Sequence, residues 1–444
     1  MKTIKRRTIS LLVIIAVMLS GLGIYIARLI RDGRDWAAFG AAVAASSSGS
    51  YTPGTVFDRY GVVLATTNDG FRIYSDDEDT RRATLHAVGD LYGNIGTGAL
   101  SIFSSELTGY NFISGTYSAD GSGGKVYLSI DADLNVAAYN ALYGRKGAVA
   151  VADCDTGELL CLFSSPTFDP QEPPETLEYD EYYDGVFINR ALSSTYTPGS
   201  IFKLVTLAAA LENIDDINDR TFTCEGNIIV NDEYITCTGE HGDLSIQEAL
   251  AVSCNCAFAE IALELGGDTI KEYAERFGLL ESYDLNGVPT AAGSFVSEKR
   301  GSSELAWSGV GQDRNTVNPL SFLRFITAIA NHGYASDLTQ LKSDTQCDKE
   351  LILDPETADT LARMMNYNVY YTYGEENYPD LELYAKSGTA EVGPELQPHA
   401  WFVGFAKADG RTLAFAVVIE NGGWGSSEAG SVANAVLQKA FYNR

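Results

Sequence analysis

The apolar residues divide the chain into one long uncharged stretch and many shorter segments. The stretch from Thr8 to Ala27 carries no charge and is mostly Leu, Ile, Val, Ala and Gly. A helix of about 20 such residues spans the hydrocarbon core of a bilayer. Lys or Arg occupies positions 2, 5, 6 and 7, which predicts an N-terminus on the cytoplasmic side. We expect residues 1–30 to be a cytoplasmic tail and single membrane anchor, with a cleaved signal peptide as the alternative.

The pattern after this stretch predicts three further regions. Residues 31–50 include a run of Ala, Ser and Gly that is typical of a linker. Short alternating segments with many Gly, Ser and Asn predict a small β-rich module over 51–145. A larger unit is expected over 146–444, where strand-like and helical patterns are longer.

The larger unit has strand patterns at both ends and helices between them. An antiparallel sheet assembled from the two ends, with helices on its faces, fits this order and predicts an α+β fold. The expected strands are Gly147–Cys154, Glu158–Ser164, Leu383–Ser387, Trp401–Lys407 and Thr412–Glu420, and the expected helices are Ser200–Glu212, Ser245–Leu265, Pro319–Asn331 and Ser426–Phe441.

Charge and metal-ligand content exclude two function classes. The formal net charge is −28, so a nucleic-acid partner, which requires a basic face, is not expected. The chain has four scattered histidines and no Cys-x-x-Cys pair, so we expect no zinc site.

The seven cysteines would all lie outside the cytoplasm, where disulfides can form. Cys224 and Cys237 bracket a short polar loop and are the best candidates for a pair. Cys254 and Cys256 fall in a helical pattern and are expected to be small buried side chains.

Ser200 and Lys203 are the first candidates for chemistry. Pro198 and Gly199 predict a turn immediately before them, so Ser200 should open a helix and share a face with Lys203. A serine there can act as a nucleophile, and a buried lysine with a lowered pKa can act as its base. A capping serine beside a surface lysine is the alternative.

Two further polar groups follow along the chain. Ser253 and Asn255 interrupt an apolar face of the helix expected at Ser245–Leu265, and buried polar groups need partners. Lys386, Ser387, Gly388 and Thr389 end an expected strand with a cation and two hydroxyls, which suits a bound carboxylate. Each motif alone is common in proteins.

Together the three motifs, in this order, match the set found in penicillin-binding proteins and serine β-lactamases. The sequence resembles a class B penicillin-binding protein, a peptidoglycan D,D-transpeptidase, over nearly the whole chain. Supporting segments are Gly54–Ala65, Asn189–Ala191, His241-Gly242, Gly311-Gln312 with Pro319, and His399–Phe402.

Departures from the family pattern are small. Cys254 stands in the middle of the second motif, where Asp or Ser is usual, and Ser387 stands where Thr is frequent. Neither change removes a required functional group. The region before Gly147 is short for the family, so we expect only a pedestal or dimerisation-like module there.

The resemblance implies a role for each candidate residue. Ser200 would attack the D-Ala-D-Ala carbonyl of a stem peptide, Lys203 would accept its proton, and Ser253 would protonate the departing D-alanine. Asn255 would hold the substrate amide and Lys203. Lys386, Ser387, Gly388 and Thr389 would bind the terminal carboxylate, and the amides of Ser200 and Thr389 would form the oxyanion hole. No metal or organic cofactor is implied.

The expected partners are the stem peptide, β-lactams and a membrane glycan polymerase of the SEDS type. Two alternatives share the site. A membrane-anchored serine β-lactamase would hydrolyse the acyl-enzyme quickly, whereas a mainly scaffolding protein of a wall-synthesis complex would leave the site idle. A β-lactam sensor should carry several membrane spans, and one span is visible in the sequence.

Overall fold

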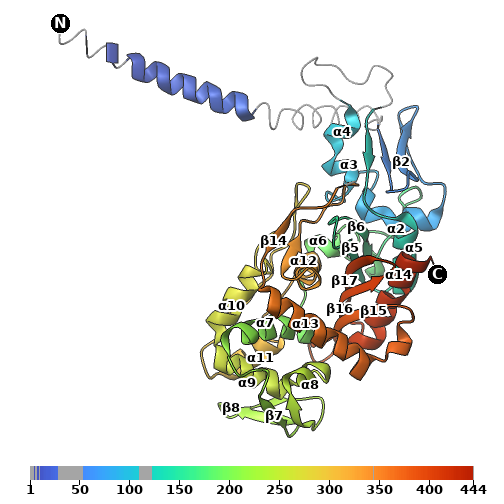
Figure 1. Ribbon diagram of the computed structural model, residues 1–444. Coiled ribbons are helices and arrows are strands. Elements are labelled where there is room, and N and C mark those ends of the chain that lie inside the picture. Colours follow the sequence, from blue (N-terminus) through green and yellow to red (C-terminus); the bar gives the residue numbers. More distant parts are fainter. Residues whose placement is uncertain are drawn as a thin grey trace.

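The computed structural model describes residues 5, 8, 9, 11–28, 54–109, 123–343 and 345–443. A helix near the N-terminus extends away from a folded body that contains the described residues from Gly54 onward (Figure 1). This helix, Leu11–Arg28, is long and apolar enough to cross a membrane, and none of it is buried against other residues. The linker predicted at 31–50 lies outside the described residues.

The N-terminal part of the folded body contains a four-stranded sheet with the order β3-β2-β1-β4. Strand β1 pairs antiparallel with β2 and parallel with β4. The elements are β1 Thr55–Phe57, β2 Val63–Asn68, β3 Phe71–Tyr74, α2 Glu78–Val88, α3 Ala99–Ile102, α4 Ser104–Thr108 and β4 Lys125–Tyr127.

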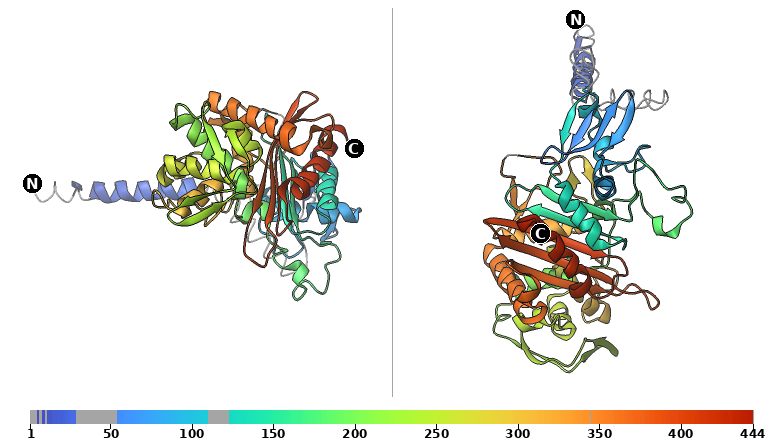
Figure 2. Two further views of the ribbon diagram at one scale, coloured as in Figure 1. Left: turned by 90° about the horizontal axis from the view of Figure 1, so that it is seen from below. Right: turned by 90° about the vertical axis from the view of Figure 1, so that its right-hand side faces the viewer.

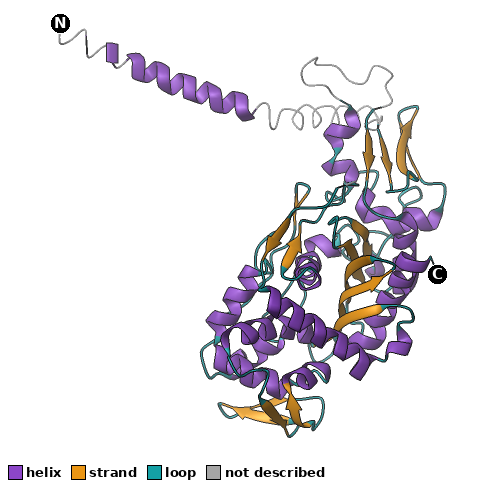
Figure 3. Cartoon of the chain, viewed as in Figure 1, coloured by secondary structure: helices purple, strands orange, loops and turns teal. Residues whose placement is uncertain are grey.

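A five-stranded antiparallel sheet with the order β15-β16-β17-β5-β6 forms the centre of the larger unit (Figure 3). The strands β5 Gly147–Asp153 and β6 Leu159–Ser165 come from its start, and β15 Glu382–Ala390, β16 His399–Ala408 and β17 Arg411–Ile419 come from its end. Strand β5 pairs with β17 in the register that places Gly147 opposite Ile419. The predicted α+β transpeptidase-like fold, with a sheet assembled from both ends, is therefore confirmed.

Helices cover both faces of this sheet (Figure 2). Alternate strand residues point to opposite faces. Phe402, Phe415 and Val417 pack in one core with the helices α5 Ala132–Leu142 and α14 Gly430–Tyr442. Val403, Ala414 and Ala416 belong to the core on the other side, where α12 Pro319–Ala330 crosses the strands. Both faces of the sheet are buried. This explains why the sequences of β5 and β6 are nearly continuous apolar runs.

A helical region fills the space between the strand-forming ends. Its elements are α6 Arg190–Ser193, α7 Lys203–Asn213, β7 Thr221–Cys224, β8 Asn227–Val230, β9 Glu233–Thr236, β10 Gly242–Ser245, α8 Ile246–Ala251, α9 Asn255–Leu265, α10 Gly267–Arg276, β11 Asp284–Leu285, β12 Val288–Pro289, α11 Ser303–Val310, β13 Tyr334–Ser336, β14 Lys349–Leu351 and α13 Pro355–Asn368. Short 3₁₀ turns lie at η1 Glu181–Tyr183, η2 Gly199–Phe202 and η4 Glu375–Asn377, and π turns at η3 Val369–Tyr373 and η5 Gly425–Ala429.

The prediction of a single helix over Ser245–Leu265 is wrong, because the segment forms two helices. Helix α8 ends at Ala251, Ser253 has a left-handed φ of 56°, and Cys254 caps a second helix, α9, by accepting a hydrogen bond from Ala257 N–H. Both helices bury most of their apolar residues, so the apolar spacing in the sequence continues across the break. A positive φ costs about 1–2 kcal/mol for a residue with a side chain, so the surrounding contacts must hold this turn.

Candidate active site

Ser200 lies in the 3₁₀ turn η2, directly before α7, where Lys203 is the first residue. The preceding Gly199 has φ 55°, and a side chain there would meet the carbonyl oxygen of Thr389 at 2.9 Å. Only glycine therefore allows the turn to lie this close to β15. The result is a nucleophile candidate at a helix start, beside the edge strand of the central sheet.

Lys203 is fully buried and surrounded by oxygen atoms. Its Nζ lies 3.2 Å from Ser200 Oγ, 2.6 Å from Ser253 O, 3.1 Å from Ser253 Oγ and 2.8 Å from Asn255 Oδ1. An ammonium has three N–H donors and no acceptor, whereas a neutral amine donates twice and accepts once. Because two neighbours are carbonyl oxygens and two are hydroxyls, a neutral Lys203 can donate to the carbonyls and accept from a hydroxyl.

The turn between α8 and α9 supplies the side chains that hold Lys203. Asn255 also donates from Nδ2 to Thr236 O at 2.9 Å, which attaches the turn to the neighbouring hairpin β8–β9. Ser253 is therefore presented from a break between helices rather than from inside one. This break turns both Ser253 Oγ and its carbonyl oxygen toward Lys203.

Lys386 approaches the same turn from β15. It is fully buried, and its Nζ lies 3.1 Å from Ser253 Oγ and 2.9 Å from Ser387 O. Ser253 Oγ therefore bridges the two lysines.

Burial sets the protonation of both lysines. Removal from water disfavours the ammonium form and lowers the pKa of Lys203 to about 8. Burial, followed by repulsion from Lys203, lowers the pKa of Lys386 well below its usual range. Both shifts favour the neutral amine over the ammonium, so Lys203 is prepared to accept a proton.

The remaining residues of the third motif are hydrogen-bonded within the protein. Tyr373, at the end of η3, accepts a hydrogen bond from Ser387 N–H at 2.8 Å and donates to Ser387 Oγ at 3.0 Å. Thr389 Oγ1 accepts from Gly425 N–H at 3.2 Å. A side chain at Gly388 would meet Pro198 O at 2.8 Å, so this glycine permits the approach of β15 to the nucleophile turn.

Segments far apart in sequence fix the nucleophile turn in place. Gly199 N–H donates to Gly311 O at 2.9 Å, and a side chain at Gly311 would meet Gly199 O at 2.1 Å. Trp401 Nε1 donates to Thr197 O at 3.0 Å from the neighbouring strand β16. The sequence singled out Gly311 and Trp401 only through the family resemblance.

The structure thus brings Ser200, Lys203, Ser253, Asn255 and Lys386 into one hydrogen-bonded cluster, with Ser387, Gly388 and Thr389 along the strand beside it. Sequence reasoning missed Tyr373, because a tyrosine in a Tyr-rich stretch offers no motif. It also missed that Cys224, Cys237 and His241 lie around Cys254.

Cys224 and Cys237, the best candidates for a disulfide in the sequence, are not bonded to each other. All seven cysteines are free thiols, and Cys224 and Cys237 both lie near His241 and Cys254. The short polar loop does bring the two thiols close together, as its length suggested. Both sulfurs contact His241 Nδ1, at 3.5 Å from Cys224 and 3.6 Å from Cys237.

The fold and these contacts define a class of protein. A Ser-x-x-Lys helix start, a Ser-x-Asn turn and a Lys-Ser-Gly edge strand beside a five-stranded antiparallel sheet are the shared site of penicillin-recognising proteins.

Comparisons with known proteins define the family. Residues 147–441 match the penicillin-binding protein transpeptidase domain, so the chain belongs to this family. It is 30% identical over 366 residues to peptidoglycan D,D-transpeptidase PbpA of Mycolicibacterium smegmatis, covering 72% of each chain. It is 25% identical over 368 residues to peptidoglycan D,D-transpeptidase MrdA of Haemophilus influenzae, covering 71% of this chain and 56% of that one.

A solved structure agrees with these matches. Penicillin-binding protein A of Mycobacterium tuberculosis, as its ceftriaxone acyl-enzyme, aligns with a TM-score of 0.75 and 25% identity over 87% of this chain and 98% of that one. The present chain is a class B penicillin-binding protein and a peptidoglycan D,D-transpeptidase.

Proposed function

We propose that Ser200 is the nucleophile of this transpeptidase and that Lys203 is its general base. One observation carries the proposal: the fully buried Lys203 Nζ lies 3.2 Å from Ser200 Oγ and is held there by Ser253 and Asn255. A base must lie within hydrogen-bond reach of the proton it removes, and its pKa should be near the working pH. Lys203, with a pKa lowered to about 8, meets both conditions.

In the acylation step, Ser200 Oγ forms a bond to the carbonyl carbon between the two terminal D-alanines of a stem peptide. The hydroxyl proton moves to Lys203 Nζ. The oxyanion is stabilised by the backbone amides of Ser200 and Thr389, and losing such a donor typically costs about 10²–10³ in rate.

The C–N bond of the tetrahedral intermediate then breaks. Ser253 Oγ, which lies 3.1 Å from both Lys203 Nζ and Lys386 Nζ, passes its proton to the departing D-alanine nitrogen and takes the proton held by Lys203, which becomes neutral again. An amine from a neighbouring stem peptide then forms a bond to the acyl carbon, and the ester C–O bond to Ser200 breaks. The proton lost by the amine passes through Lys203 to Ser200 Oγ, which frees the serine and completes the cross-link. A β-lactam acylates the same oxygen and remains attached.

Substrate binding is proposed for the third motif and for Asn255. Lys386, Ser387 and Thr389 hold the terminal carboxylate, and Gly388 lets the substrate lie close to the backbone. Asn255 holds the substrate amide as well as Lys203. Tyr373 orients the Ser387 hydroxyl through the two hydrogen bonds between them.

The N-terminal helix anchors the protein in the membrane, and we propose a cytoplasmic N-terminus because basic residues precede the helix. The catalytic domain is then outside the cytoplasm. A glycan polymerase of the SEDS type supplies the strands to be cross-linked and contacts the anchor and the module at 51–145.

Covalent labelling with fluorescent penicillin tests the nucleophile. We expect one label per chain, its attachment to the peptide containing Ser200, and its loss in Ser200→Ala. Ser431→Ala, which changes an exposed serine on α14, is the matched control and should label normally. Persistent labelling of Ser200→Ala would overturn the assignment.

The same assay separates a transpeptidase from a β-lactamase. A transpeptidase should be acylated stoichiometrically and release hydrolysed β-lactam slowly, whereas a β-lactamase turns over. Cross-linking of lipid-linked precursor in the presence of a polymerase then distinguishes an active enzyme from a scaffold.

A further inference from the structure

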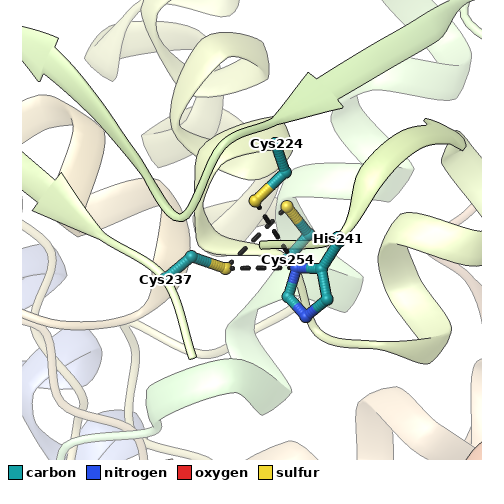
Figure 4. A group of neighbouring side chains, drawn as sticks. All are labelled: Cys224, Cys237, His241 and Cys254. Carbon is teal, nitrogen blue, oxygen red and sulfur yellow. Dashed lines mark hydrogen bonds between the residues drawn. The ribbon is translucent and has the colours of Figure 1, made fainter. Parts of the chain in front are cut away.

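Four side chains with metal-binding atoms converge beside the Ser253 turn (Figure 4). Cys224 ends β7, Cys237 follows β9, His241 precedes β10, and Cys254 caps α9. Three of these positions belong to the small hairpin region, and the fourth lies between Ser253 and Asn255. Their Sγ and Nδ1 atoms all lie within 4.8 Å of one another.

Three of the six distances between these ligand atoms are close to those around a tetrahedral zinc ion, and the remaining three are no longer than 4.8 Å. With Zn–S of about 2.3 Å and Zn–N of about 2.0–2.1 Å, tetrahedral angles place two sulfurs about 3.8 Å apart and a sulfur and nitrogen about 3.5 Å apart. Cys237 Sγ lies 3.9 Å from Cys254 Sγ, and His241 Nδ1 lies 3.5 Å from Cys224 Sγ and 3.6 Å from Cys237 Sγ. We propose that Cys224, Cys237, His241 and Cys254 bind a structural zinc ion that fixes the turn carrying Ser253.

The surroundings of the sulfurs suit thiolate ligands. Asn255 N–H donates to Cys237 Sγ at 3.2 Å, and Ala257 N–H donates to Cys254 Sγ at 3.5 Å from the first turn of α9. Donors to sulfur and the positive end of a helix stabilise thiolates, as the outer contacts of metal ligands do. Cys224 and Cys254 are buried, while Cys237 and His241 are partly exposed, which leaves an entry path for the ion.

The chemistry of the four ligands selects zinc among common ions. Three soft sulfurs with one imidazole in tetrahedral positions are a Cys₃His set, which zinc favours and which magnesium and calcium do not. Four protein ligands close the coordination shell, so the ion has a structural role.

The site acts on catalysis through the backbone on either side of Cys254. Ser253, whose φ is 56°, directly precedes this ligand, and Asn255, whose amide donates to Cys237 Sγ, directly follows it. Both neighbours contact Lys203 Nζ. A zinc ion that joins the hairpin to Cys254 therefore holds the strained turn in the orientation that presents Ser253 and Asn255 to the lysine.

Metal analysis of the full chain, purified in detergent under reducing conditions, tests the site directly. We expect close to one zinc per chain. After Zn²⁺ is replaced by Co²⁺, we expect visible absorption bands of a tetrahedral, thiolate-bound ion. Cys224→Ser and His241→Ala should lose the ion, His241→Cys should retain it, and Cys347→Ser should not change the zinc content, because Cys347 is outside the cluster. Wild-type zinc no higher than in Cys224→Ser, or a Cys224–Cys237 disulfide found in peptides digested without reductant, would overturn the proposal.

The positioning role has a separate readout. Removing zinc with a chelator should slow acylation by fluorescent penicillin up to about 10²-fold, the loss that a 1 Å misplacement can cause. Re-addition of Zn²⁺, but not Mg²⁺, should restore the rate. An unchanged rate in metal-free protein that keeps its fold by circular dichroism would contradict the positioning role. The metal content and Co²⁺ spectrum do not depend on Ser200, so they test the site even if the nucleophile assignment fails.

Discussion

The turn at Ser253–Asn255 belongs to two polar clusters of opposite chemistry. On one side, Lys203 and Lys386 are buried among hydroxyl, amide and carbonyl oxygens. On the other, Cys254 lies with Cys224, Cys237 and His241, which are soft ligands for a metal. The lysine cluster must transfer protons between its groups, whereas the cysteine cluster must keep its ligand atoms in fixed positions. The comparison teaches that one short turn can position Ser253 and Asn255 accurately if Cys254, the residue between them, is held by contacts on the other side of the turn.

Removing the base from the lysine cluster should have the largest effect on acylation. Lys203→Arg keeps a positive charge but cannot lose a proton near neutral pH. We expect acylation by fluorescent penicillin to fall by about 10²–10⁴-fold, the usual contribution of general base catalysis. Lys349→Arg is a control of the same chemical change on a partly exposed lysine and should leave the rate unchanged. A Lys203→Arg variant with near-normal acylation would show that the lysine supplies charge rather than a base.

Acylation should also depend on pH through Lys203. The neutral amine is the base, and burial lowers its pKa to about 8, so the rate should rise with pH and level off above that value. Below the midpoint, each pH unit should change the rate by about tenfold, because the neutral fraction changes by that factor. Stopped-flow acylation between pH 5.5 and 9.5 measures this curve. A flat profile would mean that Lys203 is already neutral throughout the range.

Cys254→Ser tests whether the two clusters are coupled. A serine oxygen can still cap α9, so the helix should persist, while one metal ligand is lost. We expect zinc loss and a decrease in acylation of about tenfold, as for other changes around metal sites, which is smaller than for Lys203→Arg. Cys161→Ser changes another buried cysteine, in β6, and should retain both zinc and activity. Normal acylation in zinc-free Cys254→Ser would show that the clusters are independent.

Tyr373→Phe should have the smallest effect. It removes the acceptor for Ser387 N–H and the donor to Ser387 Oγ but keeps the packing of the ring against Phe402. A lost hydrogen bond of this type costs about 1 kcal/mol, so we expect acylation efficiency to fall roughly fivefold. The decrease should come from weaker initial β-lactam binding rather than slower bond formation. Tyr370→Phe, on an exposed tyrosine of the same segment, should behave as wild type.

The elements of the central sheet could be predicted because their patterns are local. The predicted strands at Trp401–Lys407 and Thr412–Glu420 correspond to β16 and β17, with Ala408-Asp409-Gly410 at the connection. Strand β16 begins two residues earlier and ends one residue later than predicted, and β17 is shifted by one residue toward the N-terminus, because hydrogen bonds from neighbouring strands set the ends of each element. The break at Ser253 could not be predicted, because apolar residues on both sides keep helical spacing and the positive φ depends on tertiary contacts.

The residues of the candidate site also divide into those that local sequence motifs predict and those that only the packing of distant segments brings to the site. Ser200, Lys203, Ser253, Asn255 and Lys386 could be selected because each belongs to a short motif with a recognised order along the chain. Tyr373 could not, because its importance arises from where η3 packs against β15. The cluster of Cys224, Cys237, His241 and Cys254 could not be predicted either, because we excluded a zinc site on the scattered histidines and the absence of a Cys-x-x-Cys pair, and that rule assumes ligands close in sequence.

The sequence by itself determined the apolar N-terminal segment, the α+β order of elements and the residue types available for acyl transfer. These properties follow from composition and from periodicities that each segment carries alone. The tertiary structure decided which groups became partners: it buried Lys203 and Lys386 on either side of Ser253 Oγ, and it gathered Cys224, Cys237, His241 and Cys254 around one point. The physical reason is that burial and distances between segments set both pKa values and metal geometry, and neither quantity exists until the chain is packed.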